Sequence, residues 1–99
     1  MKLAQIFFAL AFALNCAAAD KPIRALIVTG GCCHNYAFQS QAITQAVSKV
    51  ANVQWTILQD PRKGTTGEIE LYNNPKWAAP YDIVIHNECF ADTDSPEYI

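Results

Sequence analysis

The chain has few basic residues and no large excess of either charge. It contains 7 Lys and Arg against 9 Asp and Glu, which gives a formal net charge of −2 at pH 7. Domains that bind nucleic acid through their bulk charge are strongly basic, so this class of function is excluded. The sequence also lacks internal repeats and low-complexity tracts. With 99 residues and 11% aromatics, it has the size and composition of at most one folded domain.

Long apolar runs are also missing, except at the N-terminus. There, Lys2 precedes the apolar stretch Leu3–Leu14, and small residues lead up to Ala19. This three-part pattern predicts a secretory signal peptide over residues 1–19. A membrane anchor is the weaker interpretation, because a spanning helix needs ~20 predominantly apolar residues. We therefore expect an exported protein, periplasmic or extracellular, with no membrane attachment after signal cleavage.

The cysteines leave the disulfide pattern open. Cys16 departs with the predicted signal peptide, and its lipid modification is a weaker alternative because Asn15 is a poor neighbour for a lipoprotein cleavage site. The odd number that remains, Cys32, Cys33 and Cys89, allows at most one internal disulfide. Adjacent cysteines seldom bond to each other, so the alternatives are a bond from Cys32 or Cys33 to Cys89, or free thiols. No standard zinc spacing is present, and we predict no metal and no other cofactor.

Four segments predict an α/β fold. Arg24–Thr29 and Ile83–Ile85 are continuously apolar, which is typical of buried parallel strands, whereas Val53–Leu58 alternates as an edge strand does. Phe38–Ala51 has the apolar spacing of an amphipathic helix. Its predicted buried stripe consists of Phe38, Ala42, Ile43, Ala46, Val47 and Val50. These patterns favour a flavodoxin-like parallel sheet with strand order 2-1-3 and right-handed crossovers.

The remaining segments predict short elements and an unfinished domain. The connection 59–81 should be a loop with a short helical turn that opens at Asn74 and carries Trp77. Asp94–Glu97 has the residues of a helix start. The third strand would then lack both a covering helix and a fourth neighbour, which leaves an apolar edge open. We therefore expect residues 20–99 to be the N-terminal portion of a longer domain.

A ligand site is predicted where two polar segments converge. Ligands of open parallel sheets bind beyond the carboxyl ends of the strands, next to the switch in strand order. With order 2-1-3, that point lies between Gly30–Tyr36, after the first strand, and His86–Phe90, after the third. The predicted binding residues are Gly30, Gly31, His34, Tyr36, Asn87 and Glu88. His34 and Glu88 are also the candidate catalytic pair, because imidazole and carboxylate groups exchange protons near neutral pH.

Each of these residues also has a structural interpretation. The glycine pair equally suits a tight turn without a ligand, and it matches neither a Walker loop nor a dinucleotide fingerprint. His34 would then form a hydrogen bond to the backbone, and Tyr36 would pack at the start of the helix. Glu88 would accept hydrogen bonds from backbone N–H groups. We interpret His86 as a core residue. A cysteine nucleophile would need an activating base, for which His34 is the nearest candidate in sequence.

The sequence resembles the ThuA-like family. The resemblance is carried by Ile23–Asn35 and Asp82–Ala91, and it extends in order over nearly all of Ile23–Ile99. Asn52–Thr56 and Gly64–Ile69 are similar to the exported bacterial branch of this family. The resemblance implies a flavodoxin-like fold of the class I glutamine-amidotransferase-like type. It also implies a role in carbohydrate metabolism, since the family is linked by name to trehalose utilisation.

The resemblance places individual residues as well. His34 falls on the polar residue that follows the family's Gly-Gly turn, and Asn87 and Glu88 fall on its Asn-Glu pair. The amidotransferase nucleophile would follow a later strand beyond Ile99, so amidotransferase activity is not implied. The expected function is the processing or binding of a small carbohydrate ligand. A non-catalytic carbohydrate-binding or accessory module is the alternative, and the oligomeric state is left open.

Overall fold

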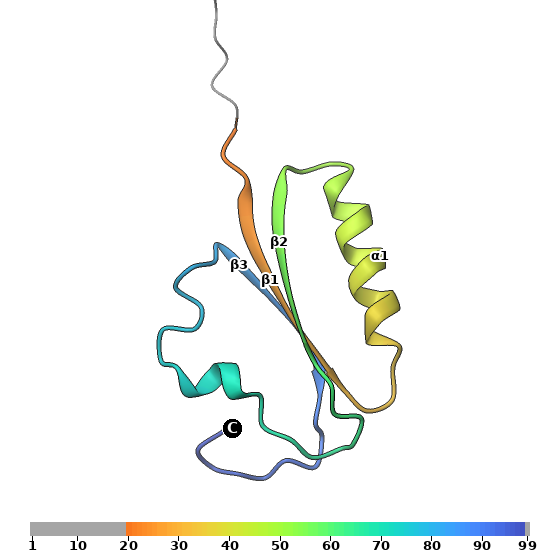
Figure 1. Ribbon diagram of the computed structural model, residues 1–99, viewed down its shortest axis with the longest axis vertical. Helices are drawn as coiled ribbons and strands as arrows, with labels where there is room; N and C mark the ends of the chain where they lie inside the picture. Colours follow the sequence, from red (N-terminus) through yellow and green to blue (C-terminus); the bar gives the residue numbers. More distant parts are fainter. Residues whose placement is uncertain (1–19, 99) are drawn as a thin grey trace, which may run out of the picture.

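The fold is described by a computed structural model over residues 20–98. The predicted signal peptide, residues 1–19, lies outside the described residues. In chain order the elements are β1 (Ile23–Gly31), α1 (Tyr36–Ser48), β2 (Val53–Asp60), the 3₁₀ helix η1 (Glu70–Asn73) and β3 (Ile83–Cys89). The strands are parallel in the order β2-β1-β3 (Figure 1). The predicted α/β class and 2-1-3 order are therefore confirmed, and they are consistent with part of a flavodoxin-like fold.

β1 is the buried strand of this sheet. Leu26 is paired with Thr56 of β2 on one side and with Val84 of β3 on the other. Both faces are also covered, so that every residue of Ala25–Gly31 is buried. A strand with neighbours on both edges and cover on both faces needs apolar side chains in both directions, which explains its continuous apolar run.

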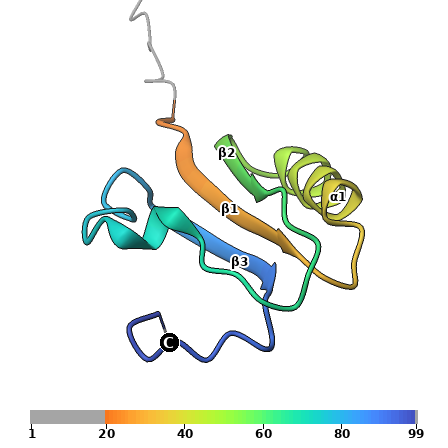
Figure 2. The ribbon, with the colours of Figure 1, turned by 60° about the horizontal axis from the view of Figure 1, so that its bottom comes forward.

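The two faces of the sheet are covered by different segments. Helix α1 lies on one face, and the connection that contains η1 lies on the opposite face (Figures 1 and 2). The core on the η1 face is centred on Leu26, Val28 and Ile69. Seven partly buried residues pack against it: Leu58, Leu71, Tyr72, Trp77, Tyr81, Val84 and Phe90. The connection therefore supplies much of the apolar cover on this side.

Helix α1 differs from its prediction in both its start and its buried face. It begins at Tyr36, because Asn35 caps it by accepting a hydrogen bond from the Phe38 backbone N–H at 3.1 Å. The buried residues are Tyr36 and Ser40, whereas Phe38 is 65% exposed and Val50 is 86% exposed. The predicted stripe was therefore wrong at Phe38, Ala42, Ala46 and Val50, whereas Ile43 and Val47 are half-buried on the same helix face as Tyr36 and Ser40. The helix turns a row of two hydroxyl-bearing side chains toward the sheet, and a count of apolar residues alone misses that row.

β3 is longer and more exposed than predicted. It extends to Cys89, so that His86 and Glu88 lie within the strand rather than after it. Within residues 20–98 it pairs with β1 alone and forms one edge of the sheet, with Ile83 exposed. β2 forms the other edge, as its alternating pattern predicted.

Two short elements also differ from the prediction. η1 ends at Asn73, and the predicted helical turn at Asn74 is a set of turns in which the Trp77 N–H donates to the Asn74 carbonyl at 2.9 Å. Asp94–Glu97 does not start a helix within the described residues. The Tyr98 N–H donates to the Ser95 carbonyl at 3.0 Å, which closes a single turn rather than the i to i+4 ladder of an α-helix.

Candidate functional site

The last two residues of β1, Gly30 and Gly31, are held by close backbone contacts with the neighbouring strands. Gly30 and Gly31 have φ angles of +129° and +99°, a region that favours glycine. A Cβ at Gly30 would lie 2.7 Å from the Asp60 carbonyl oxygen, and one at Gly31 would lie 2.1 Å from the Cys89 carbonyl oxygen. The ends of β2 and β3 therefore close on the two glycines from both sides. The glycine pair expected to form a turn is therefore the end of β1, and the chain bends only from Cys32 onward.

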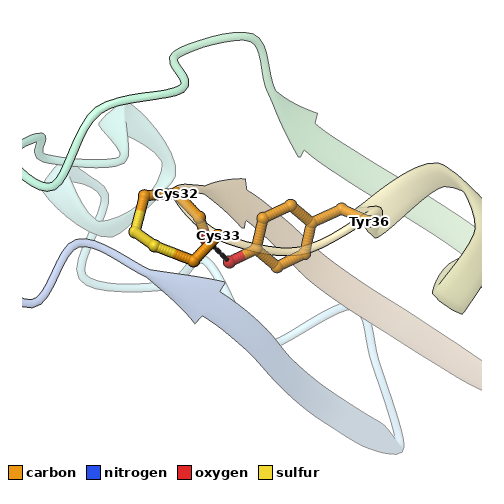
Figure 3. The surroundings of a disulfide bond; sticks show 3 residues. All are labelled: Cys32, Cys33 and Tyr36. Carbon is orange, nitrogen blue, oxygen red and sulfur yellow. Dashed lines mark hydrogen bonds between the residues drawn. A yellow bond between two sulfur atoms is a disulfide. The ribbon is translucent and has the colours of Figure 1, made fainter.

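The two adjacent cysteines form a disulfide directly after β1. Cys32 is bonded to Cys33, and Cys89 is a free thiol (Figure 3). The expectation that neighbouring cysteines would not pair was wrong, and neither alternative for Cys32 and Cys33, a bond to Cys89 or free thiols, is found. Cys33 has a left-handed φ of +83°, which departs from the extended backbone that holds successive side chains apart. Cys89 contacts this loop through its backbone instead, because its carbonyl accepts the Cys32 N–H at 3.1 Å.

His34 lies in the loop after β1, Tyr36 is the first residue of α1, and the two differ in burial. His34 is exposed, and its ring meets the Tyr36 ring edge to face at a centroid distance of 5.8 Å. Tyr36 is buried, and its hydroxyl donates to the Cys32 carbonyl at 2.6 Å. Burial raises the pKa of the Tyr36 phenol, which keeps it protonated as this donor. Tyr36 therefore ties the loop to the start of α1.

The loop forms one wall of a hollow of about 460 Å³, which we call the loop hollow. Gly30, Gly31, Cys33, His34 and Tyr36 line this wall, and the segment Gln59–Lys63 after β2 lines the other. Arg62 donates to both carboxylate oxygens of Asp60 and to the Glu68 carbonyl, at 2.5–2.8 Å. The Arg62 guanidinium lowers the pKa of Asp60, so this carboxylate stays charged. The wall formed by Gln59–Lys63 therefore carries an ion pair between Asp60 and Arg62.

Glu88 lies in a different cluster, on the η1 face of β3. Its Oε1 accepts a hydrogen bond from the Tyr72 hydroxyl and lies 2.9 Å from His86 Nδ1. The Tyr72 hydroxyl is also 3.0 Å from His86 Nδ1, so the three polar groups touch one another. Glu88 Oε2 is buried and has no hydrogen-bond partner within residues 20–98. This arrangement leaves one carboxylate oxygen with unused capacity to accept a hydrogen bond.

The protonation of Tyr72 fixes the direction of one hydrogen bond in this cluster. Burial, followed by the hydrogen bond to Glu88, raises the pKa of the Tyr72 phenol well above its usual range. The phenol is therefore neutral at physiological pH and donates a hydrogen bond to the Glu88 carboxylate. His86 Nδ1 lies beside the same carboxylate oxygen, which favours a proton on Nδ1 and leaves Nε2 as the acceptor of a neutral imidazole.

This cluster lines a second hollow, of about 250 Å³, which we call the β3 hollow. Its lining residues are Tyr72, His86, Glu88, Phe90 and Tyr98. The side chain of Glu88 is 16% exposed and that of His86 is 55% exposed. The interpretation of His86 as a core residue was therefore wrong, because its ring lies at the surface beside a carboxylate.

Asn87 points away from this cluster. Its Nδ2 donates to Gln39 Oε1 of α1 at 3.1 Å and lies 3.5 Å from Thr29 Oγ1. Successive side chains of a strand point to opposite faces, so Asn87 faces α1 while Glu88 faces η1. The donor of Asn87 is used to tie β3 to the helix.

The structure does not bring His34 and Glu88 into one pocket. His34 lines the loop hollow, whereas Glu88 lines the β3 hollow. The predicted shared site is thus replaced by two separate hollows. Tyr72 and His86 were missed as partners of Glu88. The spacing of His86 and Glu88 by two residues in a strand already placed both on one face, but nothing in the sequence located Tyr72.

Comparisons with known proteins gave no match. No family model matches the chain, and no significant match was found among the curated proteins or the solved structures. Within residues 20–98, no group of three or more His, Cys, Asp or Glu side chains is arranged to hold a metal ion. The described helices are also too short or too polar to cross a bilayer.

Proposed function

We propose that this chain is an exported ThuA-like domain protein that processes or binds a sugar or sugar derivative in the β3 hollow. The single observation that carries the proposal is the mutual contact of Tyr72, His86 and Glu88 on the floor of that hollow. The sequence resemblance over Ile23–Ile99 supplies the family and the substrate class.

The lining of the β3 hollow suits a sugar ring. A sugar presents hydroxyl groups at its edge and C–H groups on its faces. The side chain of His86 is 55% exposed and offers Nε2 as an acceptor for a hydroxyl, and the rings of Phe90 and Tyr98 offer apolar surface for the C–H faces. Pockets for drug-sized ligands measure about 300–1,000 Å³. A hollow of about 250 Å³ therefore suits one small ring, with the rest of a larger sugar outside it.

The same cluster supplies the groups for proton transfer. The Glu88 carboxylate holds His86 through Nδ1, and Nε2 makes no hydrogen bond within residues 20–98. A carboxylate that orients an imidazole through one nitrogen leaves the other nitrogen free to accept a proton from a substrate. We assign His86 Nε2 as the general base and Glu88 as the residue that orients it.

Binding can be measured through Trp77, whose ring lies 5.0 Å from that of Tyr72 and 5.8 Å from that of His86. Trp55→Phe leaves Trp77 as the single tryptophan, since the sequence has 2. We expect its fluorescence to change in a saturable way on titration with trehalose, glucose or oxidised disaccharides. The full chain is used, and products are analysed in parallel.

The variants separate an enzyme from a binding module. Glu88→Gln should lower turnover by about 10- to 150-fold, because His86 loses a hydrogen bond to a charged acceptor, which is worth ~1.5–3 kcal/mol. His86→Ala should abolish turnover with a smaller effect on binding, while Glu68→Gln is the matched control on an exposed carboxylate. Saturable binding of a sugar, with no product formed from any sugar tested, would favour the accessory-module alternative. Absence of any saturable signal would contradict the proposal itself.

A further inference from the structure

The Cys32–Cys33 disulfide presents its two sulfur atoms in different environments. Cys32 is 9% exposed and does not line the loop hollow, whereas Cys33 is exposed and does. Two hydrogen bonds hold the backbone of Cys32. Its N–H donates to the Cys89 carbonyl, and its carbonyl accepts from the Tyr36 hydroxyl. Figure 3 shows the disulfide at this position, beside the Tyr36 hydroxyl. A reagent from solvent therefore meets the sulfur of Cys33 first.

We propose that the Cys32–Cys33 pair is a site of reversible thiol–disulfide exchange with a soluble dithiol, entered through the sulfur of Cys33. In the first step a thiolate of the dithiol attacks Cys33 Sγ, the S–S bond breaks, and Cys32 leaves as a thiolate that takes up a proton. In the second step the other thiolate of the reagent displaces Cys33. Two protein thiols and one oxidised reagent result, so electrons and protons balance.

The geometry of the loop suits a reaction that runs in both directions. Both hydrogen bonds involve the backbone N–H and carbonyl of Cys32 and not its sulfur, so neither depends on the oxidation state of the disulfide. The cysteines stay adjacent in the chain after reduction, and re-oxidation is an intramolecular step at high effective concentration. Reduction opens the ring that includes the peptide between them and releases Cys33 from its left-handed φ of +83°.

Reduction should therefore act on the loop hollow. Cys33 and His34 lie side by side on its wall, and the ring limits how the backbone between β1 and α1 can move. We expect the amide protons of Cys33 and His34 to exchange faster with solvent in the reduced protein. Amides of β1 should be unaffected, because their ladder bonds to β2 and β3 do not involve the disulfide.

The first test maps thiols on the unmodified full chain. The protein is alkylated before and after treatment with dithiothreitol, then digested so that each cysteine is assigned separately. Cys32 and Cys33 should be unmodified before reduction and almost fully modified after it, with Cys33 trapped first as the mixed disulfide. Alkylation of both without reductant, a Cys89 bond to either of them, or resistance to dithiothreitol in the folded protein would overturn the proposal.

A second test probes the reduced pair with phenylarsine oxide. One trivalent arsenic bonds to two neighbouring sulfurs with the release of one water molecule, which is detected as a mass increase of the intact protein. Cys89→Ser should retain this capture and Cys33→Ser should lose it. The reverse pattern would mean that Cys89 supplies one of the reacting thiols, and it would overturn the assignment to the adjacent pair. Circular dichroism of each variant, compared with the parent chain, confirms that the folded protein is being tested.

Discussion

Gly31→Ala tests whether the carboxyl end of β1 is as closely packed as described. The new Cβ would lie 2.1 Å from the Cys89 carbonyl oxygen, so β1 and β3 must shift apart at their carboxyl ends. The φ of +99° is also unfavourable for alanine. Backbone strain of this kind costs about 1–3 kcal/mol, and overpacking of a dense site adds about 1–3 kcal/mol. The free energy of unfolding should therefore fall by roughly 2–6 kcal/mol.

The measurement is urea denaturation followed by circular dichroism, with thermal unfolding as a check. For a domain of this size, each kcal/mol lowers Tm by about 4–8 °C, so the decrease should be at least ~8 °C. Gly64→Ala is the matched control. A Cβ there meets only the Thr66 nitrogen, at 4.0 Å, and Gly64 does not have a positive φ. Its stability should be unchanged or higher by up to about 1 kcal/mol. Equal stability of the two variants would refute the packing argument.

Three further predictions concern the rest of the fold. Asn35→Ala should cost about 1 kcal/mol of unfolding free energy and lower the helical circular dichroism signal, because α1 loses its N-cap. Ile69→Ala should cost about 2–5 kcal/mol in the same assay, since Ile69 is fully buried in the core on the η1 face; a loss below 1 kcal/mol would show that this core is not formed. Arg24 lowers the pKa of Asp82 to about 2, so this pair should contribute stability above the ordinary Asp pKa and lose it as the pH falls toward 2. Asp82→Asn should flatten the pH dependence of Tm over that range, and an unchanged slope would contradict the pairing.

The sheet could be predicted from the sequence because its signals are local. A continuous apolar run marked β1 and an alternating run marked β2, and both patterns follow from which faces each strand buries. The burial of Tyr36 and Ser40 on α1 was missed because both side chains carry hydroxyl groups. Burial of such groups depends on tertiary partners, such as the Cys32 carbonyl that accepts the Tyr36 hydroxyl.

The candidate site was predicted in part for the same reason. Strand order 2-1-3 correctly placed the ends of β1 and β3 side by side, as the pairing of Gly31 with Cys89 shows. The position of Tyr72 depends on how the connection between β2 and β3 folds over the sheet, for which the sequence has no periodic signal. The disulfide was missed because it requires the left-handed backbone of Cys33, which is uncommon for a residue other than glycine.

The alternation of side chains along β3 makes its alignment with β1 a chemical constraint. Asn87 and Glu88 are neighbours in sequence, yet the amide holds the helix on one side and the carboxylate meets a phenol and an imidazole on the other. A slip of one residue would exchange them, setting a charge against Gln39 and an amide beside Tyr72. The pairing of two strands thus decides which face of the sheet carries an acid.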